Sequence, residues 1–195
     1  MTTTNKNKIE YGISKVHYAK ITGVSNGAYT YATPVAIPNA TAITLSQVGE
    51  NVDLYADNIP AITLQSNQGY DGSITFLTIP DEFRQDILGE TVDSAGVQIE
   101  NADAIPSEFA LLFQFEGDST GKRHVLYRCR CQRPNMSSKT KTNSIETDNQ
   151  ELTLTVRPRT TDKRVKAGVI QNTTTEAIYN SWFTSVYEQP PTQGE

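Results

Sequence analysis

The sequence predicts a single, mainly β domain with two short helices. Short runs of alternating apolar and polar residues recur between residues 11 and 170, and turn residues such as Gly, Pro and Asn separate them. Apolar residues at helical spacing occur near 80–88 and 174–187. A chain of 195 residues is long enough to bury a substantial core in one domain.

The most apolar stretch, between Phe109 and Arg133, predicts a long β-hairpin. A loop at 117–121 would pair Glu116 with Lys122 and set Phe113 opposite Val125. The same register places Leu111 opposite Tyr127 and Phe109 opposite Cys129. The other face of the hairpin is also apolar, so its middle is expected to be covered on both sides. The predicted core residues are Phe109, Leu111, Phe113, Phe115, Val125, Tyr127 and Trp182.

Before this hairpin, alternation predicts strands at 11–21, 41–48, 51–55, 61–66 and 73–79. Pro34 and Pro38 make residues 29–37 an edge strand or a loop. The run NQGYDG at 67–72 predicts a turn. A small hairpin is expected at 91–99 and a loop at 101–106.

The first helix is expected at 80–88. Pro80 and two acidic residues open it, Phe83, Ile87 and Leu88 form its apolar stripe, and Gly89 ends it.

The second helix is expected at 174–187, with Thr173 as N-cap and Glu176 reaching back in a capping box. Its apolar face would include Ile178, Trp182 and Val186.

Strands are also expected at 151–157, with Leu152, Leu154 and Val156 inward, and at 165–170. Residues 134–150 are polar and predict an extended loop within one domain that spans 9–188. Residues 1–8 and 189–195 are expected to be flexible ends. We find no run long enough to span a membrane and no signal-peptide pattern, so we expect synthesis and assembly in a cytosol.

Charge is segregated along the chain, which has a net charge of −5. Residues 47–116 contain 13 acidic residues and a single basic one, whereas residues 117–195 contain 12 basic and eight acidic residues. This pattern fits a solvated surface, or an acidic face on one subunit that meets a basic face on the next.

The sequence offers little for catalysis, so we predict a protein that is not an enzyme and holds no cofactor or metal. No phosphate-binding, dinucleotide-binding or serine-hydrolase motif occurs. Cys129, Cys131 and His124 could be zinc ligands or a nucleophile with its base. Alternation, however, turns His124 away from both thiols. The thiols lie two apart on one strand, so we expect them to be reduced.

Two basic clusters, at 122–133 and 157–166, could contact nucleic acid. They lack interleaved exposed aromatic residues and the chain is acidic overall, so ion pairing with acidic neighbours is favoured.

Several stretches together resemble the major tail protein, or tail tube protein, of long non-contractile-tailed phages of Gram-positive bacteria. The matching stretches are NVDLYADNIP at 51–60, NQGYDGSITF at 67–76, LTIPDEFRQDILG at 77–89, the hairpin at 109–134, ETDNQELTLTVRPR at 146–159 and YNSWFTSVYEQP at 179–190. They cover most of the chain in order, and the first eight residues and 22–38 carry less of the likeness.

The resemblance implies a β-sandwich or barrel of two sheets flanked by helices, similar to the tube protein of type VI secretion systems. It implies a structural virion protein whose hexameric rings stack into a tube for genome delivery, assembled in the host cytoplasm. Double-stranded DNA would pass through without specific binding. Further partners would be the tail terminator, distal tail and tape measure proteins, with no membrane.

In such an assembly, strands at 41–55 and 61–79 are expected to line the tube. The candidate lumen-facing acids are Glu50, Asp53, Asp57 and Asp71. The candidate ring-stacking residues, in the 134–150 loop, are Ser137, Lys139, Lys141, Glu146 and Asp148. The alternative function is a β-sandwich binding module or tail-associated adaptor that does not polymerise.

Overall fold

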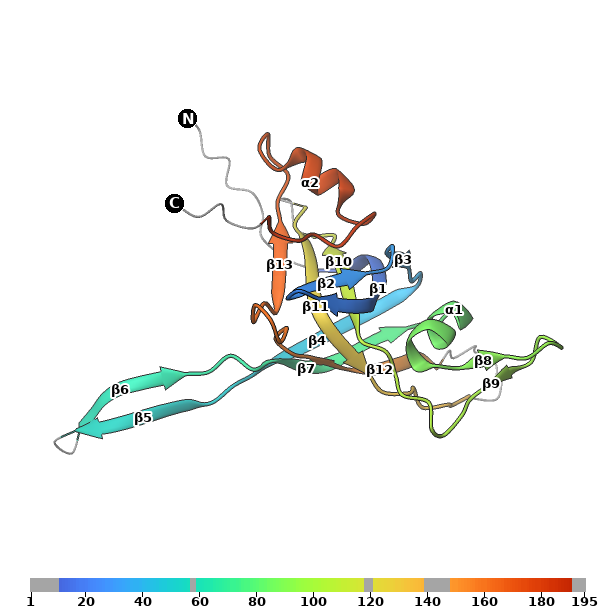
Figure 1. Cartoon of the computed structure of the whole chain (residues 1–195), viewed down its shortest axis with the longest axis horizontal. Coiled ribbons are helices and arrows are strands. Elements are labelled where there is room, and N and C mark those ends of the chain that lie inside the picture. Colours follow the sequence, from blue (N-terminus) through green and yellow to red (C-terminus); the bar gives the residue numbers. More distant parts are fainter. Residues whose placement is uncertain (1–10, 57–58, 118–120, 139–147, 191–195) are drawn as a thin grey trace, which may run out of the picture.

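A computed structural model describes residues 11–56, 59–117, 121–138 and 148–190, and it is mainly β, with antiparallel strands and few helices (Figure 1). The elements are β1 (Ile13–Ser25), β2 (Ala28–Tyr31), β3 (Val35–Ala36), β4 (Ala40–Val48), β5 (Asn51–Ala56), β6 (Ile59–Gln65), β7 (Gly69–Phe76), α1 (Asp81–Phe83), η1 (Arg84–Leu88), β8 (Thr91–Val92), β9 (Gln98–Ile99), β10 (Phe109–Phe115), β11 (Arg123–Cys131), β12 (Gln150–Val156), β13 (Lys166–Val169) and α2 (Glu176–Ser181).

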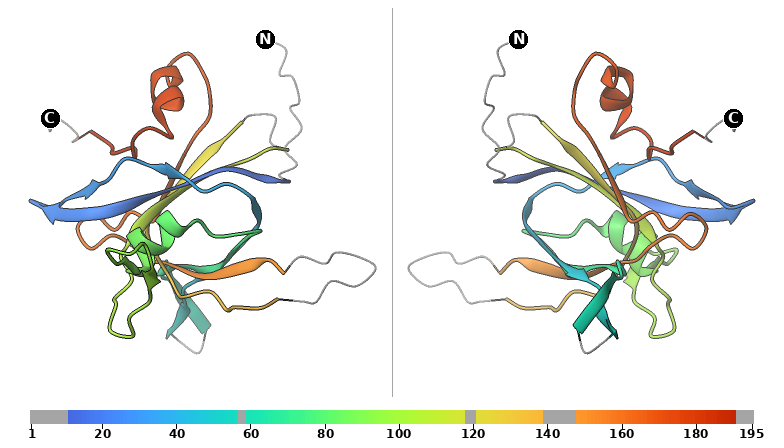
Figure 2. Two further views of the ribbon diagram at one scale, coloured as in Figure 1. Left: turned by 90° about the vertical axis from the view of Figure 1, so that its right-hand side faces the viewer. Right: turned by 90° about the vertical axis from the view of Figure 1, so that its left-hand side faces the viewer.

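The main sheet has the strand order β2-β1-β10-β11-β12-β7-β4, with β3 beside β1 and β13 beside β11. Strand β11 connects the two parts of this sheet, because its first half pairs with β13 and its second half pairs with β12. The sheet thus folds into two layers around a shared core (Figure 2). This arrangement is consistent with the expected β-sandwich, although its two layers are parts of one hydrogen-bonded sheet.

The register of the β10–β11 hairpin differs from the prediction over most of its length. Phe109 lies opposite Cys129 as expected, but Leu111 lies opposite Leu126 and Phe113 lies opposite His124. The cause is a bulge that places one extra residue in β11 between these pairs. A bulge reverses the alternation of the strand beyond it, so the predicted single apolar face does not form.

The bulge distributes the predicted core residues over two hydrophobic clusters. Phe109, Leu111 and Phe113 pack between the two layers of the sheet, whereas Val125 and Tyr127 point to the other face. The residues that join this second cluster include Ala110, Leu112, Tyr179 and Trp182. Of the seven predicted core residues, Phe115 alone is only partly buried. Both faces of the hairpin are therefore covered, as the sequence predicts.

The first helix agrees with the prediction. It spans α1 and the π-helical turn η1, and Phe83, Ile87 and Leu88 are buried in the core between the layers. Gly89 ends it with a φ of 79°, a left-handed conformation that glycine adopts at low cost.

The second helix is shorter than predicted, and its capping box is wrong. The side-chain oxygen of Asn172 accepts hydrogen bonds from the backbone N–H groups of Thr174 and Thr175, both at 2.9 Å. These bonds form a turn before the helix, which then begins later than predicted, at Glu176. Helix α2 then covers the outer face of the sheet through Tyr179 and Trp182.

The turn predicted at 67–72 is also wrong, because β7 begins at Gly69 and runs through Gly72. Gly72 lies opposite Leu45 in β4, and a Cβ there would lie 1.8 Å from the carbonyl oxygen of Thr44. Glycine is needed here for a close approach of two backbones rather than for a turn.

We expect Gly72→Ala to lower the free energy of unfolding by about 1–3 kcal/mol, because backbone atoms must move to admit the methyl group. Urea denaturation measures the change. Ser73→Ala, the neighbouring substitution on the solvent side of β7, is the control and should change stability by less than about 0.5 kcal/mol. Equal effects of the two substitutions would contradict the close-approach interpretation.

Candidate assembly surface

The most prominent surface feature is an arm formed by β5 and β6, which extends away from the body of the molecule (Figure 1). The arm continues the β4–β7 ladder without a break. The Gln68 N–H donates to the Val48 carbonyl at 2.8 Å, and the Ser66 N–H donates to the Glu50 carbonyl at 3.0 Å. This backbone continuity sets the direction in which the arm leaves the sheet.

The arm is amphipathic. Leu54 lies opposite Ile62, and Leu64 lies two residues further along β6, so all three share one face. Their exposed fractions are 47%, 57% and 53%. On the opposite face, the Thr63 hydroxyl donates to the Asp53 carboxylate at 2.6 Å. An isolated two-stranded hairpin is marginally stable in water. An apolar face left uncovered on such a hairpin indicates a surface that another molecule covers.

The open edge of strand β4 is a second candidate contact surface. The strand is nine residues long, it pairs only with β7 in the part of the chain that the structure describes, and its sequence ATAITLSQV has no charged residue and no proline. Natural edge strands are usually protected by such residues. The open edge of β4 is therefore suited to pair with a strand of another chain.

A further apolar surface lies at the far end of the molecule from the arm, on the β8–β9 hairpin (Figure 1). Val92, Val97 and Ile99 are 47%, 55% and 46% exposed. Two apolar surfaces at opposite ends can join copies head to tail, and such contacts generate rings or filaments.

The predicted lumen-facing acids do not form one cluster. Glu50 and Asp53 are exposed at the base and on the polar face of the arm. Asp71 instead lies in β7, where its two carboxylate oxygens accept hydrogen bonds from Arg157 at 2.7 and 3.1 Å. Asp57 lies outside the described residues.

Of the predicted stacking residues, Ser137 is exposed and Asp148 is partly buried. Lys139, Lys141 and Glu146 lie outside the described residues.

The basic clusters form ion pairs with acidic residues of the same chain, whereas the sequence predicted acidic partners either within the subunit or on a neighbouring one. Glu108 binds both Arg128 and Arg130 at 2.8 Å, and Arg157 binds Asp71. Arg133 likewise binds Glu100 at 2.9 Å. The acidic middle of the chain thus compensates much of its basic C-terminal part, which weakens the case for a phosphate-binding surface.

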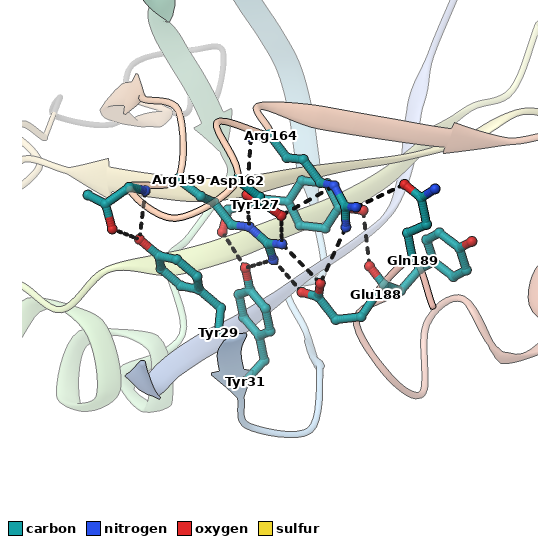
Figure 3. A network of polar contacts seen from close by, with 10 residues as sticks. Tyr29, Tyr31, Tyr127, Arg159, Asp162, Arg164, Glu188 and Gln189 are labelled. Atoms are coloured by element: carbon teal, nitrogen blue, oxygen red, sulfur yellow. Dashed lines mark hydrogen bonds and ion pairs between the residues drawn. The ribbon is translucent and has the colours of Figure 1, made fainter. Parts of the chain in front are cut away.

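One arginine of the second cluster is the centre of a buried polar network (Figure 3). Arg159 is 2% exposed, and its guanidinium binds the carboxylates of Asp162 and Glu188. It also donates to the Tyr31 hydroxyl at 3.3 Å and lies 4.8 Å from the centre of the Tyr127 ring. The network ties the end of the described chain to β2 and β11. Its charges are satisfied internally, so its role is structural.

The network makes stability depend on acid pH. The hydrogen bond from Arg159 is the main cause that lowers the pKa of Asp162 from 3.8 to about 2. Because the folded pKa is the lower one, this contribution is complete above about pH 5 and is lost as the pH falls from about 4 to 2.

Through this carboxylate, the free energy of unfolding of the wild type should fall by about 1 kcal/mol over that interval, a small value because the carboxylate is partly exposed. In Asp162→Asn we expect this pH-dependent loss to be absent. Guanidinium denaturation between pH 6 and pH 2.5 tests this. Thr161→Ala should keep the wild-type pH dependence, and an unchanged pH profile in Asp162→Asn would contradict the assignment.

The described part of the chain contains no group of three His, Cys, Asp or Glu side chains placed to hold a metal ion. Cys129 and Cys131 are free and buried, and burial raises both pKa values, to about 12 for Cys131. None of the helices among the described residues is both long and apolar enough to cross a membrane. Comparison with known proteins finds no matching family model and no similar curated protein.

The sequence predicts both strands of the arm but not that they project from the body. The apolar residues that mark the arm are visible in the sequence, because Leu54, Ile62 and Leu64 alternate with polar residues on the two predicted strands. Alternation alone does not tell whether the apolar face meets a core or another molecule.

Proposed function

We propose that the chain is a tail tube protein of a long non-contractile-tailed phage, a structural subunit that forms hexameric rings stacked into a tube for DNA delivery. The observation that carries the proposal is the amphipathic arm, whose apolar face is left exposed. A monomer gains nothing from such a surface, whereas a polymerising subunit buries it at every contact. The sequence resemblance to tail tube proteins supports the same assignment.

The open edge of β4 supports the joining of subunits into a ring. A strand of the next subunit would add to this edge and continue the sheet, which is how a closed barrel removes its edges. The arm would cover part of a neighbouring subunit at the same time. Because the arm and the β8–β9 hairpin differ, each contact would be heterologous, and a set of such contacts closes into a ring at a suitable rotation.

The solvent side of β7 and β12 supports a conduit for DNA. Ser73 lies opposite Thr153, and Thr75 lies opposite Glu151, all on the side away from the buried residues of these strands. A face of hydroxyl groups and a carboxylate would not hold phosphates, so DNA could slide past it. The tail terminator, distal tail and tape measure proteins would contact the tube at its ends or inside it.

Electron microscopy and sedimentation velocity of the purified protein test this function. We expect rings or tubes of uniform diameter that grow with protein concentration. A variant that lacks residues 138–149 should fold, as judged by circular dichroism, but should not stack rings into long tubes. A protein that stays monomeric at high concentration at every salt concentration, with and without tail-tip complexes as initiators, would instead support a binding module that does not polymerise.

A further inference from the structure

A basic hollow on the sheet surface has no role in the fold described so far. Its volume is about 250 Å³, and it lies between the start of β10 and the second halves of β11 and β12. The residues that line it are Glu108, Arg128, Arg130, Thr155 and Arg157. Arg130 and Thr155 lie directly opposite each other in the sheet. The hollow is therefore held in place by regular strand pairing rather than by a loop.

The hollow is lined by three guanidinium groups and one carboxylate, and Asp71 beside it pairs with Arg157, so one positive charge is in excess. Burial opposes ionisation of Glu108, but hydrogen bonds and charge from Arg128 and Arg130 outweigh it and lower its pKa. Glu108 uses both oxygens on Arg128, at 2.9 and 2.8 Å, and accepts from Nε of Arg130 at 2.8 Å. Within the described residues, these contacts leave the two terminal nitrogens of Arg130 for another acceptor, and the Arg130 side chain is 60% exposed. A guanidinium presented in this way matches a carboxylate.

A second hollow of about 270 Å³, with both polar and apolar lining residues, adjoins the basic one and shares Arg130 and Thr155 with it. Its lining includes Ile105, which is 82% exposed, and Pro106. The two hollows together form what we call the arginine groove, with a cationic end and an apolar end. Such a groove fits a segment in which a carboxylate is close to apolar side chains.

We propose that the arginine groove binds the β5–β6 arm of a second copy of this chain, with the Asp53 carboxylate at Arg130. The proposal rests on the proposed function, because it names the contact that joins two subunits. The arm suits the groove in charge and in apolar character. Between Gly49 and Ser66 the sequence has three acidic residues and no basic residue, and Tyr55, which lies on the same face of β5 as Asp53, is 69% exposed.

The occupant must come from another copy, because the arm extends away from the body that carries its own groove (Figure 1). A nucleic acid suits the groove less well. Glu108 lies inside it and Asp71 lies on Arg157 beside it, so a chain of phosphates would meet two carboxylates. A single carboxylate needs only the free end of Arg130.

A charge exchange tests the contact. Arg130→Glu and Asp53→Arg should each weaken self-association at least tenfold in sedimentation velocity at low salt. The self-association constant of the double variant should be within about threefold of the wild-type value, since the ion pair is restored with its charges exchanged. Lys163→Glu, which reverses an exposed charge that does not line either hollow, should leave association unchanged. Thermal unfolding of each monomer checks that the variants fold.

The outcomes separate this inference from the proposed function. If the wild type forms tubes and Arg130→Glu forms them equally well, the groove is not the docking site and the tube assignment stands. If both single variants fail and the double variant recovers nothing, Asp53 does not bind at Arg130. If the wild type does not self-associate under any condition, the proposed function fails first.

Discussion

We expect the substitution Ile62→Asp to abolish tube formation while the monomer remains folded. Ile62 lies on the apolar face of the arm and is 57% exposed, so the monomer loses little when it changes. In an assembly the same side chain would be buried, which is worth about 1.5–3 kcal/mol per contact. An aspartate there also places an unpaired charge in the contact. Each contact therefore weakens roughly 10- to 100-fold or more, and a tube depends on many contacts.

The control for Ile62→Asp is Gln65→Asp, which adds the same charge to the same strand. Gln65 lies opposite Asn51 on the face of the arm that carries Asp53, which would meet a cationic groove, so an added carboxylate there should not weaken assembly. Negative-stain microscopy and sedimentation velocity measure both variants. Normal tubes from Ile62→Asp would show that the apolar face of the arm is not an assembly surface.

We expect the substitution Arg159→Met to lower the free energy of unfolding by about 3 kcal/mol. The guanidinium is almost fully buried, and its removal leaves Asp162 and Glu188 to Arg164, which is 3.2 and 3.9 Å from them. Breaking one side of a buried ion pair costs about 3–5 kcal/mol, and the lower end is expected here because Arg164 still compensates part of the charge. The Tyr31 hydroxyl also loses a donor.

Arg164→Met is the matched control, because Arg164 binds the same two carboxylates from a more exposed position. Loss of the Arg164 guanidinium should lower the free energy of unfolding by less than about 1 kcal/mol. Urea denaturation at neutral pH measures both variants. Similar small losses in the two variants would mean that the buried network does not hold the end of the chain to β2 and β11.

Local patterns determined much of the fold from the sequence. Alternation in β12 correctly placed Leu152, Leu154 and Val156 in the core, because a strand with one polar and one apolar face has one favourable orientation. The helical spacing of Phe83 and Ile87, followed by Gly89, correctly placed the first helix. In both cases a few neighbouring residues contain the whole signal.

Contacts between distant segments decided the rest. The bulge in β11 follows from its pairing with β10, β12 and β13 at once, and no short pattern shows it. Gly72 has the local pattern of a turn residue, but β4 lies against it, and a turn at Asn172 stands where the sequence predicts the cap at Thr173. Each of these depends on which backbone groups meet after folding.

For the candidate assembly surface, too, the sequence determined some features and the tertiary structure decided others. The sequence by itself determined that Leu54, Ile62 and Leu64 alternate on strands and that the middle of the chain is acidic. Only the tertiary structure decided that this apolar row lies on a projecting arm, and that Asp71 is paired with Arg157 whereas Asp53 is exposed. The physical reason is that periodicity tells which side chains share a face, and only the arrangement of the other elements determines what covers that face.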